Sequence, residues 1–310
     1  MIKRFTEEQI ERLKSLTGGS VSFGVSLSSF TSFKVGGRAE ALYEPKDIEE
    51  LSMVISFANV ASLPYVVIGR GSNILVRDAG IGGLVIRFGR KIAGLRLEEK
   101  VNRHELICGA GAQLKDLMRF CADEGLSGLE FLAGIPGSAG GAISVNTGAF
   151  GSDIGGKVTG IKVVKPDGSV EAIEGRDLHF GYRELSLGRG WIVVEGAFAV
   201  ERAEKEDVRG RIKDFIRKRN EKQPLDAPSA GSIFKNPPGD YAGRLIEAAG
   251  LKGMQRGGAR ISPVHANWIV NIGGAGSDDI IGLINTARER VKEVSGIELE
   301  LEIRILGDES

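Results

Sequence analysis

The feature that most constrains the fold is a dense alternation of short apolar segments with glycine turns between residues 38 and 200. Only two segments in this region have helical periodicity, 47–57 and 113–124, and Gly125 is placed to end the second. A doubly wound domain would alternate one helix with each strand, so this pattern favours an α+β fold. The expected strands are Ala39–Tyr43, Tyr65–Ile68, Asn73–Val76, Leu84–Phe88, Glu105–Cys108, Ile161–Val164, Val170–Ile173 and Trp191–Val200.

The pattern changes after residue 200. Amphipathic periodicity predicts helices over 204–222 and 240–249, and a third helix that Ser277 caps and Gly296 ends. Strict alternation then predicts a strand over 298–306. The length of 310 residues agrees with about two domains of roughly 150 residues each. We therefore expect one domain over 1–200 and a second over 201–310.

Glycine contributes 45 of the 310 residues, about twice the usual share of roughly 7%. One concentration, Gly69-Arg70-Gly71-Ser72-Asn73, lies between two expected strands and is able to present backbone N–H groups to a phosphate. An ordinary hairpin turn explains it equally well. The other lies between residues 134 and 160, where nine glycines fall. Because ordered glycine costs backbone entropy, we expect close approach to a ligand there, with tight strand packing as the alternative.

Composition excludes several classes of function. The 41 basic and 41 acidic residues balance, so we expect neither a nucleic-acid partner nor an anionic membrane surface. No stretch approaches the roughly 18 apolar residues of a membrane span, and no apolar signal core follows Met1, so the sequence predicts a cytoplasmic protein. Cys108 and Cys121 fit neither a disulfide framework nor metal-ligand spacing, which predicts buried free thiols and no metal site.

Five motifs occur in order between Thr31 and Gly307: Gly69–Asn73, Ile135–Ala142, Gly181–Arg183, Ala230–Pro237 and His265–Asn271. Together they resemble the UDP-N-acetylenolpyruvoylglucosamine reductase family. The short distance from Arg183 to Trp191 resembles the subgroup that lacks an inserted tyrosine loop.

The resemblance implies an FAD-binding domain of the vanillyl-alcohol-oxidase (PCMH) type, with two subdomains that meet near residue 95, followed by an α+β substrate-binding domain. Backbone N–H donors suit both the phosphates and the flavin carbonyls, which accounts for the glycine content. The residues expected to bind FAD are Gly69, Arg70, Gly71, Ser72, Asn73, Gly134, Ile135, Pro136, Gly137, Ser138, Gly140, Gly141, Ala142 and Asn146.

The activity that the resemblance implies is reduction of UDP-N-acetylglucosamine enolpyruvate to UDP-N-acetylmuramate, a peptidoglycan precursor. NADPH reduces FAD and leaves, the enolpyruvyl substrate takes its place, and hydride passes from flavin N5 to the β carbon. Charge then builds on the substrate carboxylate and a proton must reach the α carbon, so the site needs a charge stabiliser and an acid. We expect a monomer.

The resemblance assigns the catalytic roles to Arg183, Ser232 and Glu302. Arg183 would stabilise the enolate, since a guanidinium keeps its charge, Ser232 would donate the proton, and Glu302 would assist as an acid with a raised pKa. Without the resemblance, the residues themselves favour a surface arginine, a serine that merely ends a loop, and a glutamate on the solvated face of a strand.

For the diphosphate of the substrate, we expect cations and amides in the second domain. From residue 209 to 222 there are seven basic and two acidic residues, although part of this group is typical of a solvated helix face. One position departs from the family: Leu185 stands where a serine is common, and Ser186 follows one residue later. The residues expected to bind substrate are Tyr182, Lys235, Asn236, Asn267, Arg217 and Lys222.

Two other functions remain open at this point. A related FAD oxidase acting on an alcohol or sugar would share the first domain, but the motifs around Ser232 and Asn267 argue against it. A flavin- or nucleotide-binding module without catalysis is disfavoured by the joint presence of Arg183, Ser232 and Glu302.

Overall fold

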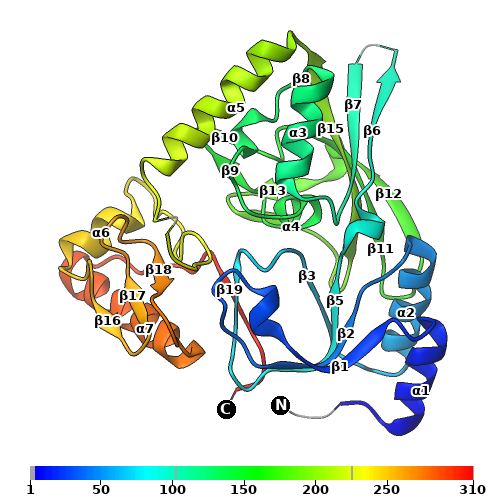
Figure 1. Cartoon of the computed structure of the whole chain (residues 1–310), viewed down its shortest axis with the longest axis horizontal. Coiled ribbons are helices and arrows are strands. Elements are labelled where there is room, and N and C mark those ends of the chain that lie inside the picture. Colours follow the sequence, from blue (N-terminus) through cyan, green and yellow to red (C-terminus); the bar gives the residue numbers. More distant parts are fainter. Residues whose placement is uncertain (1–3, 102, 225, 310) are drawn as a thin grey trace.

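The computed structural model describes residues 4–101, 103–224 and 226–309. Its first sheet has the order β1-β2-β5-β3 (Figure 1). The strands β2 (Arg38–Tyr43), β5 (Ile81–Arg87) and β3 (Tyr65–Ile68) are parallel, and β1 (Val21–Ser26) joins β2 antiparallel. The helices α1 (Glu7–Leu16) and α2 (Ile48–Val60) share a core with this sheet.

The second sheet is antiparallel, in the order β12-β11-β15-β7-β6. Beside it lie α3 (Leu114–Glu124), the short α4 (Ala139–Ser144) and α5 (Lys205–Asn220), with α5 packed on α3 and on the 3-10 turn η3 (Glu130–Leu132). A small strand, β8 (Leu126–Ser127), pairs with β15. The sheet strands are β12 (Val170–Glu174), β11 (Val158–Val164), β15 (Ile192–Arg202), β7 (Arg103–Gly109) and β6 (Leu95–Lys100).

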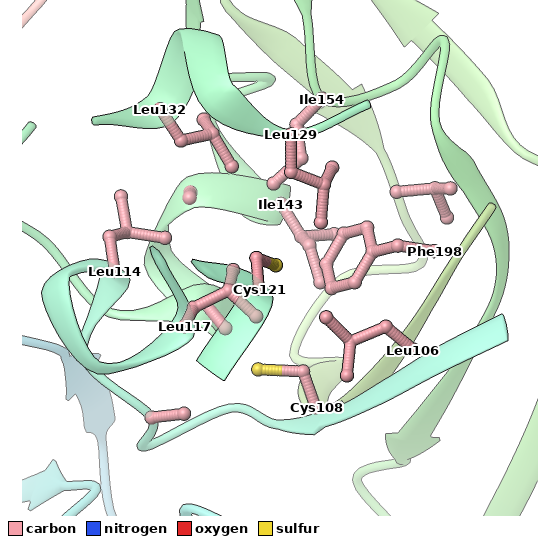
Figure 2. Packing of buried hydrophobic residues seen from close by; sticks show 14 of the residues in the cluster. Leu106, Cys108, Leu114, Leu117, Cys121, Leu129, Leu132, Ile143, Ile154 and Phe198 are labelled. Carbon is pink, nitrogen blue, oxygen red and sulfur yellow. The ribbon is translucent and has the colours of Figure 1, made fainter. Parts of the chain in front are cut away.

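The core between this sheet and its helices contains both cysteines, and Figure 2 shows their thiols among Leu106, Leu117 and Phe198. Both are free and buried, which confirms the prediction. Burial raises the pKa of Cys108 far above its usual value and that of Cys121 to about 12. These thiols therefore behave as small apolar groups.

The third part consists of α6 (Ala242–Ala248), α7 (Ser277–Ser295) and a three-stranded sheet of β16 (Gln255–Arg256), β17 (Ala259–Ile261) and β18 (Ile269–Asn271). Its core also includes Phe33 and Leu75 from the N-terminal half of the chain. Several contacts tie it to the first part. The strand β19 (Arg304–Leu306) pairs parallel with β4 (Ile74–Val76), and the backbone N–H of Ser277 donates to the Asp78 carboxylate at 2.8 Å.

Two hairpins complete the fold: β9 (Gly148–Ala149) with β10 (Ser152–Asp153), and β13 (His179–Gly181) with β14 (Glu184–Ser186). Among the described residues, no helix combines the length and the apolar character that crossing a bilayer requires.

The structure confirms the α+β prediction and each of the eight strands expected before residue 201, apart from small shifts at their ends. The strand expected over 298–306 is wrong in extent, because only Arg304–Leu306 forms one. Apolar and polar residues alternate before this strand because the side chains of Leu299 and Ile303 enter the core. The backbone of the same segment forms hydrogen bonds with residues 233–235. Ser277 is the first residue of α7 rather than its cap, which is Gly276.

The strands β1 and β6 and the short hairpins were not predicted. The first helix after the expected boundary at 201, α5, packs on the second sheet's helix α3 and contributes Ile212 and Phe215 to that core. The subdomain boundary expected near residue 95 and the domain boundary expected at residue 201 stay predictions.

Candidate active site

A cavity of about 1030 Å³ lies where the three parts of the fold meet, and its lining comes from all of them. This volume reaches the upper end of the roughly 300–1,000 Å³ typical of ligand pockets. Every residue expected to bind the cofactor lines it except Asn146, and so do Arg183, Ser232 and Glu302. The fold thus gathers segments from across the whole sequence at one cavity.

The loop from Gly69 to Asn73, which joins β3 to β4, forms one wall. Gly71 has φ 71°, and a Cβ there would lie 2.0 Å from the carbonyl oxygen of Phe30, so only glycine fits. The Gly71 carbonyl accepts hydrogen bonds from the backbone N–H and the hydroxyl of Ser32, at 3.0 and 3.1 Å. Within the described residues, the backbone N–H groups of 70–73 have no acceptor, so this loop of the cavity lining has donors to spare for a ligand.

The segment from Gly134 to Ala142 forms the facing wall. Ser138 caps α4, while the N–H groups of Ala139 and Gly140 donate to the carbonyls of Ala112 and Ala110 at 2.8 and 3.0 Å. Part of this segment is therefore packed tightly against the chain before α3. Asn146 lies outside the cavity lining.

The side chain of Asn146 connects two turns. Its Nδ2 donates to the Gly181 carbonyl at 2.8 Å and its Oδ1 accepts from the Gly155 N–H at 2.9 Å. Asn146 therefore anchors the β13–β14 hairpin, which carries Arg183, to the turn at Gly155.

Arg183 occupies the turn of that hairpin with φ 60°, a left-handed conformation that is rare for a residue with a side chain. Its Nη1 donates to the Gly148 carbonyl at 2.9 Å, and its Nε lies 3.0 Å from Oε1 of Glu302. Leu185, at the position that departs from the family, lines the cavity with an apolar side chain. The hairpin therefore holds the Arg183 guanidinium in a fixed position at the cavity, next to the carboxylate of Glu302.

Glu302 is positioned from both sides of the cavity. Its backbone N–H donates to the Ile233 carbonyl at 2.8 Å, and its carbonyl accepts from Nδ2 of Asn73 at 3.1 Å. Burial raises the pKa of its carboxyl group, an effect that the positive charges of Arg183 and Lys235 partly oppose. A carboxyl group with a raised pKa keeps its proton to a higher pH than an unperturbed glutamate does.

Ser232 lies beside Glu302 because Ile233 bonds to the Glu302 backbone. Within the described residues, the Ser232 hydroxyl has no hydrogen-bond partner. The adjoining backbone is fixed by Asn267, whose Oδ1 accepts from the Phe234 N–H at 3.0 Å while its Nδ2 donates to the Phe234 carbonyl at 2.8 Å. Asn267 is 3% exposed, so its amide orients the serine segment and does not face the cavity.

The six residues expected to bind substrate lie outside the cavity lining. The Tyr182 ring stacks on the Arg183 guanidinium, 5.5 Å from ring centre to Cζ, and its hydroxyl accepts from the Asn236 N–H at 3.4 Å. Lys235 pairs with Glu300, and Oδ1 of Asn236 accepts from the N–H of Ala242.

On α5, the exposed Arg217 pairs with Asp214 and Glu221, and Lys222 is exposed beyond the helix end. The basic residue of this segment that lines the cavity is Arg219. A sequence signal for it existed, since 208, 212, 215 and 219 follow one helical stripe whose first three members are apolar. Arg304 also lines the cavity, as do the aromatic side chains of Tyr65, Phe88 and Trp191, which no motif indicated.

Comparison with known proteins identifies the relatives of this chain. The model of the UDP-N-acetylenolpyruvoylglucosamine reductase C-terminal domain matches residues 223–306, and that of an FAD-binding domain matches residues 39–174. The UDP-N-acetylenolpyruvoylglucosamine reductase of Rubrobacter xylanophilus is 41% identical over 93% of this chain and 96% of its own length. The Clostridium botulinum reductase of the same name is 42% identical over 92% of each chain.

Solved structures were compared with this chain as well. The crystal structure of UDP-N-acetylenolpyruvylglucosamine reductase (MurB) from Thermus caldophilus has a TM-score of 0.79 and 37% identity, over 91% of this chain and 97% of that one. A Phl p 4 variant described as a glucose oxidase has a TM-score of 0.50 at 12% identity, a likeness of fold alone. The chain therefore belongs to the UDP-N-acetylenolpyruvoylglucosamine reductase family and is an FAD-dependent oxidoreductase.

Proposed function

We propose that this protein reduces UDP-N-acetylglucosamine enolpyruvate to UDP-N-acetylmuramate, a peptidoglycan precursor, with NADPH as the source of electrons. The observation that carries this proposal is the convergence of Arg183, Ser232 and Glu302 on the cavity that the FAD-binding domain also lines. These residues come from the separate β13–β14 hairpin and from two segments of the C-terminal part. A cation, a hydroxyl and a protonatable carboxyl group are what reduction of a double bond conjugated to a carboxylate requires.

The residues around the cavity fit FAD. The free N–H groups of residues 70–73 would hold its pyrophosphate, and the segment from Gly134 to Ala142 would hold the edge of the isoalloxazine ring. When bound, FAD supplies the hydride that adds to the substrate's β carbon, after NADPH has reduced the cofactor.

The roles of the side chains follow from their positions. The Arg183 guanidinium, held at the hairpin turn, stabilises the negative charge that develops on the substrate carboxylate. Glu302 in its protonated form donates a hydrogen bond to that carboxylate, and its raised pKa favours this form. The Ser232 hydroxyl, which has no competing partner among the described residues, transfers its proton to the α carbon.

The test is an anaerobic stopped-flow experiment on the purified yellow protein. NADPH should bleach the visible flavin absorbance, and UDP-N-acetylglucosamine enolpyruvate should restore it rapidly. Bleaching that recovers only when air is admitted would favour an oxidase instead. A protein that cannot be loaded with FAD would refute both activities. The monomeric state and the cytoplasmic location stay predictions.

A further inference from the structure

The β13–β14 hairpin, which carries Arg183, belongs to neither of the two large sheets. Within the part of the chain that the structure describes, its two strands pair only with each other. Its apolar side chains Phe180 and Leu185 join the core of the second sheet, but apolar contacts have no preferred direction. The position of the turn with Arg183 therefore depends on the directional hydrogen bonds that reach the hairpin.

Asn146 makes a hydrogen bond to the hairpin backbone beside this turn. Its Nδ2 donates to the carbonyl of Gly181, two residues before Arg183, at 2.8 Å. Its Oδ1 accepts from the Gly155 N–H at 2.9 Å, and a Cβ on Gly155 would lie 2.6 Å from Cγ of Phe180. Asn146 is 5% exposed, so water hardly competes for either bond. Both ends of the amide are therefore engaged, and the hairpin backbone is fixed at its turn.

The residues that follow Asn146 also hold the Arg183 side chain. The carbonyl of Gly148, two residues further on, accepts from Nη1 of Arg183 at 2.9 Å. A Cβ on Gly148 would lie 3.2 Å from that Nη1 and 2.8 Å from the carbonyl oxygen of Ser152, so the guanidinium lies directly against this backbone. The segment 146–148 thus binds the hairpin backbone and the guanidinium at the same time.

This segment is continuous with the cavity wall. Most of α4 and the residue after it, Val145, line the cavity, and the N–H of Asn146 donates to the Ile143 carbonyl of α4 at 3.1 Å. Asn146 and Arg183 both have left-handed φ values, 41° and 60°, which residues with a side chain rarely adopt. Such conformations persist only where neighbouring contacts hold them. The direction of Arg183 is therefore set by the cavity wall through Asn146.

We propose that Asn146 is a positioning residue, which fixes the Arg183 guanidinium relative to the cavity wall. The inference rests on the proposed function, because it concerns the step in which negative charge builds on the carboxylate of the enolpyruvyl substrate. That step needs the cation in one place, since a displacement of about 1 Å costs up to about 10²-fold in rate. Asn146 lies outside the cavity lining, so it acts through Arg183 and touches no ligand.

The experiment measures both half-reactions of the FAD-loaded Asn146→Ala protein by anaerobic stopped-flow absorbance, with FAD content and urea unfolding recorded for each variant. Asn271→Ala is the matched control. Asn271 is also a buried amide that joins backbone groups, and none of its side-chain partners lines the cavity; these partners are Phe33, Gly273 and Ala275. Arg183→Met and the double variant Asn146→Ala/Arg183→Met complete a double-mutant cycle.

We expect Asn146→Ala to slow reoxidation of the reduced flavin by the enolpyruvyl substrate by about 10–10²-fold, because Arg183 is no longer held in place. Reduction by NADPH should be nearly unchanged, since no charge builds on a substrate carboxylate in that half-reaction. Asn271→Ala should leave both rates within about twofold of the parent protein. In the Arg183→Met background, Asn146→Ala should change reoxidation by less than about threefold, because the group that it positions is absent.

Asn146→Asp decides the question if removal of the whole amide prevents folding. The substitution keeps the shape of the side chain and an acceptor for the Gly155 N–H. The Gly181 carbonyl, however, keeps a donor only while the new carboxyl group is protonated. Relative to the parent protein at each pH, reoxidation of this variant should slow as pH rises, whereas its reduction by NADPH should not.

Equal losses in both half-reactions would show that Asn146 only stabilises the fold, and would overturn the inference. A loss that persists in full in the Arg183→Met background would also overturn it, because Asn146 would then act independently of Arg183. An Asn146→Asp protein with parent rates at every pH would contradict it as well. In each of these cases the parent protein still turns over. A parent protein whose reduced flavin is not reoxidised by the enolpyruvyl substrate refutes the proposed function itself.

Discussion

The Nε atom of Arg183 lies 3.0 Å from Oε1 of Glu302, although the two residues belong to different parts of the fold. The distance brings the charges together, yet the Nε–H is not directed at the carboxylate and has no hydrogen-bond acceptor among the described residues. The pair is thus electrostatic and leaves a donor of Arg183 unused. Since burial still raises the pKa of Glu302 beside this cation, desolvation exceeds the attraction.

The excess of desolvation over attraction at Glu302 predicts how the free energy of unfolding depends on pH. The native pKa of Glu302 is raised above its unfolded value of about 4.5, so its stabilising contribution is complete below that value and is lost as pH rises through the native pKa. The stability of the parent protein relative to Glu302→Gln should therefore fall as pH rises above about 4.5. Urea unfolding at a series of pH values measures the difference.

Glu300→Gln is the control for that experiment, because Glu300 is largely exposed and pairs with Lys235. A difference between the parent and Glu302→Gln that grew with pH would show that the attraction to Arg183 exceeds the effect of burial.

Ser232→Ala should slow reoxidation of the reduced flavin by the enolpyruvyl substrate by about 10²–10⁴-fold, because the proton donor is lost. Reduction by NADPH should be nearly unchanged, since that half-reaction needs no proton from Ser232. Ser229→Ala, which removes another hydroxyl from the cavity lining, serves as the control. Stopped-flow absorbance separates the two half-reactions, and equal losses in both would contradict the assignment of Ser232.

Asn267→Ala should destabilise the fold by about 2–4 kcal/mol, because the N–H and carbonyl of Phe234 would both lose their partner in a buried setting. Asn236→Ala should cost less, about 1 kcal/mol, since its side chain accepts one partly buried N–H. Urea denaturation measures both. A stable Asn267→Ala protein with weakened UDP binding would instead support the substrate-binding role that the sequence suggested.

The two cysteines should resist alkylation in the folded protein at pH about 8, because burial raises both pKa values and excludes the reagent. Both thiols should react once guanidinium chloride unfolds the chain. Intact-mass spectrometry with iodoacetamide measures the extent. Rapid labelling of one thiol in the native state would show that the core around Cys108 and Cys121 opens locally.

Strands and helices were predictable where the local pattern decides them. The range Tyr65–Ile68 is as predicted, and α3 ends at Gly125 in a left-handed conformation, as its glycine indicates. Thr6 and Gln9 likewise form a capping box at the start of α1, a feature that local sequence decides. The segment 298–303 was misjudged because alternation reports which side chains are buried, and a non-strand segment whose Leu299 and Ile303 enter a core gives the same pattern.

The site was only partly predictable. Motifs indicated the loops around Gly71 and Ser138, and both loops line the cavity. The amides of Asn146 and Asn267 look alike in sequence, and only the folded chain shows which backbone groups they bind. Arg219 was not separated from Arg217 within the basic segment, although it continues the apolar stripe of α5 and Arg217 does not.

The pairing of β19 with β4 joins strands that lie far apart in the sequence. Its ladder brings Arg304 to the backbone of Asn73, and the same Asn73 holds the Glu302 carbonyl. Contacts of such long range form late in folding, because the loop between them must close first. The loop of residues 69–73 and the carboxylate of Glu302 are therefore expected to come into register together, when this ladder closes, so a chain in which β19 has not paired with β4 lacks both walls of the cavity at once.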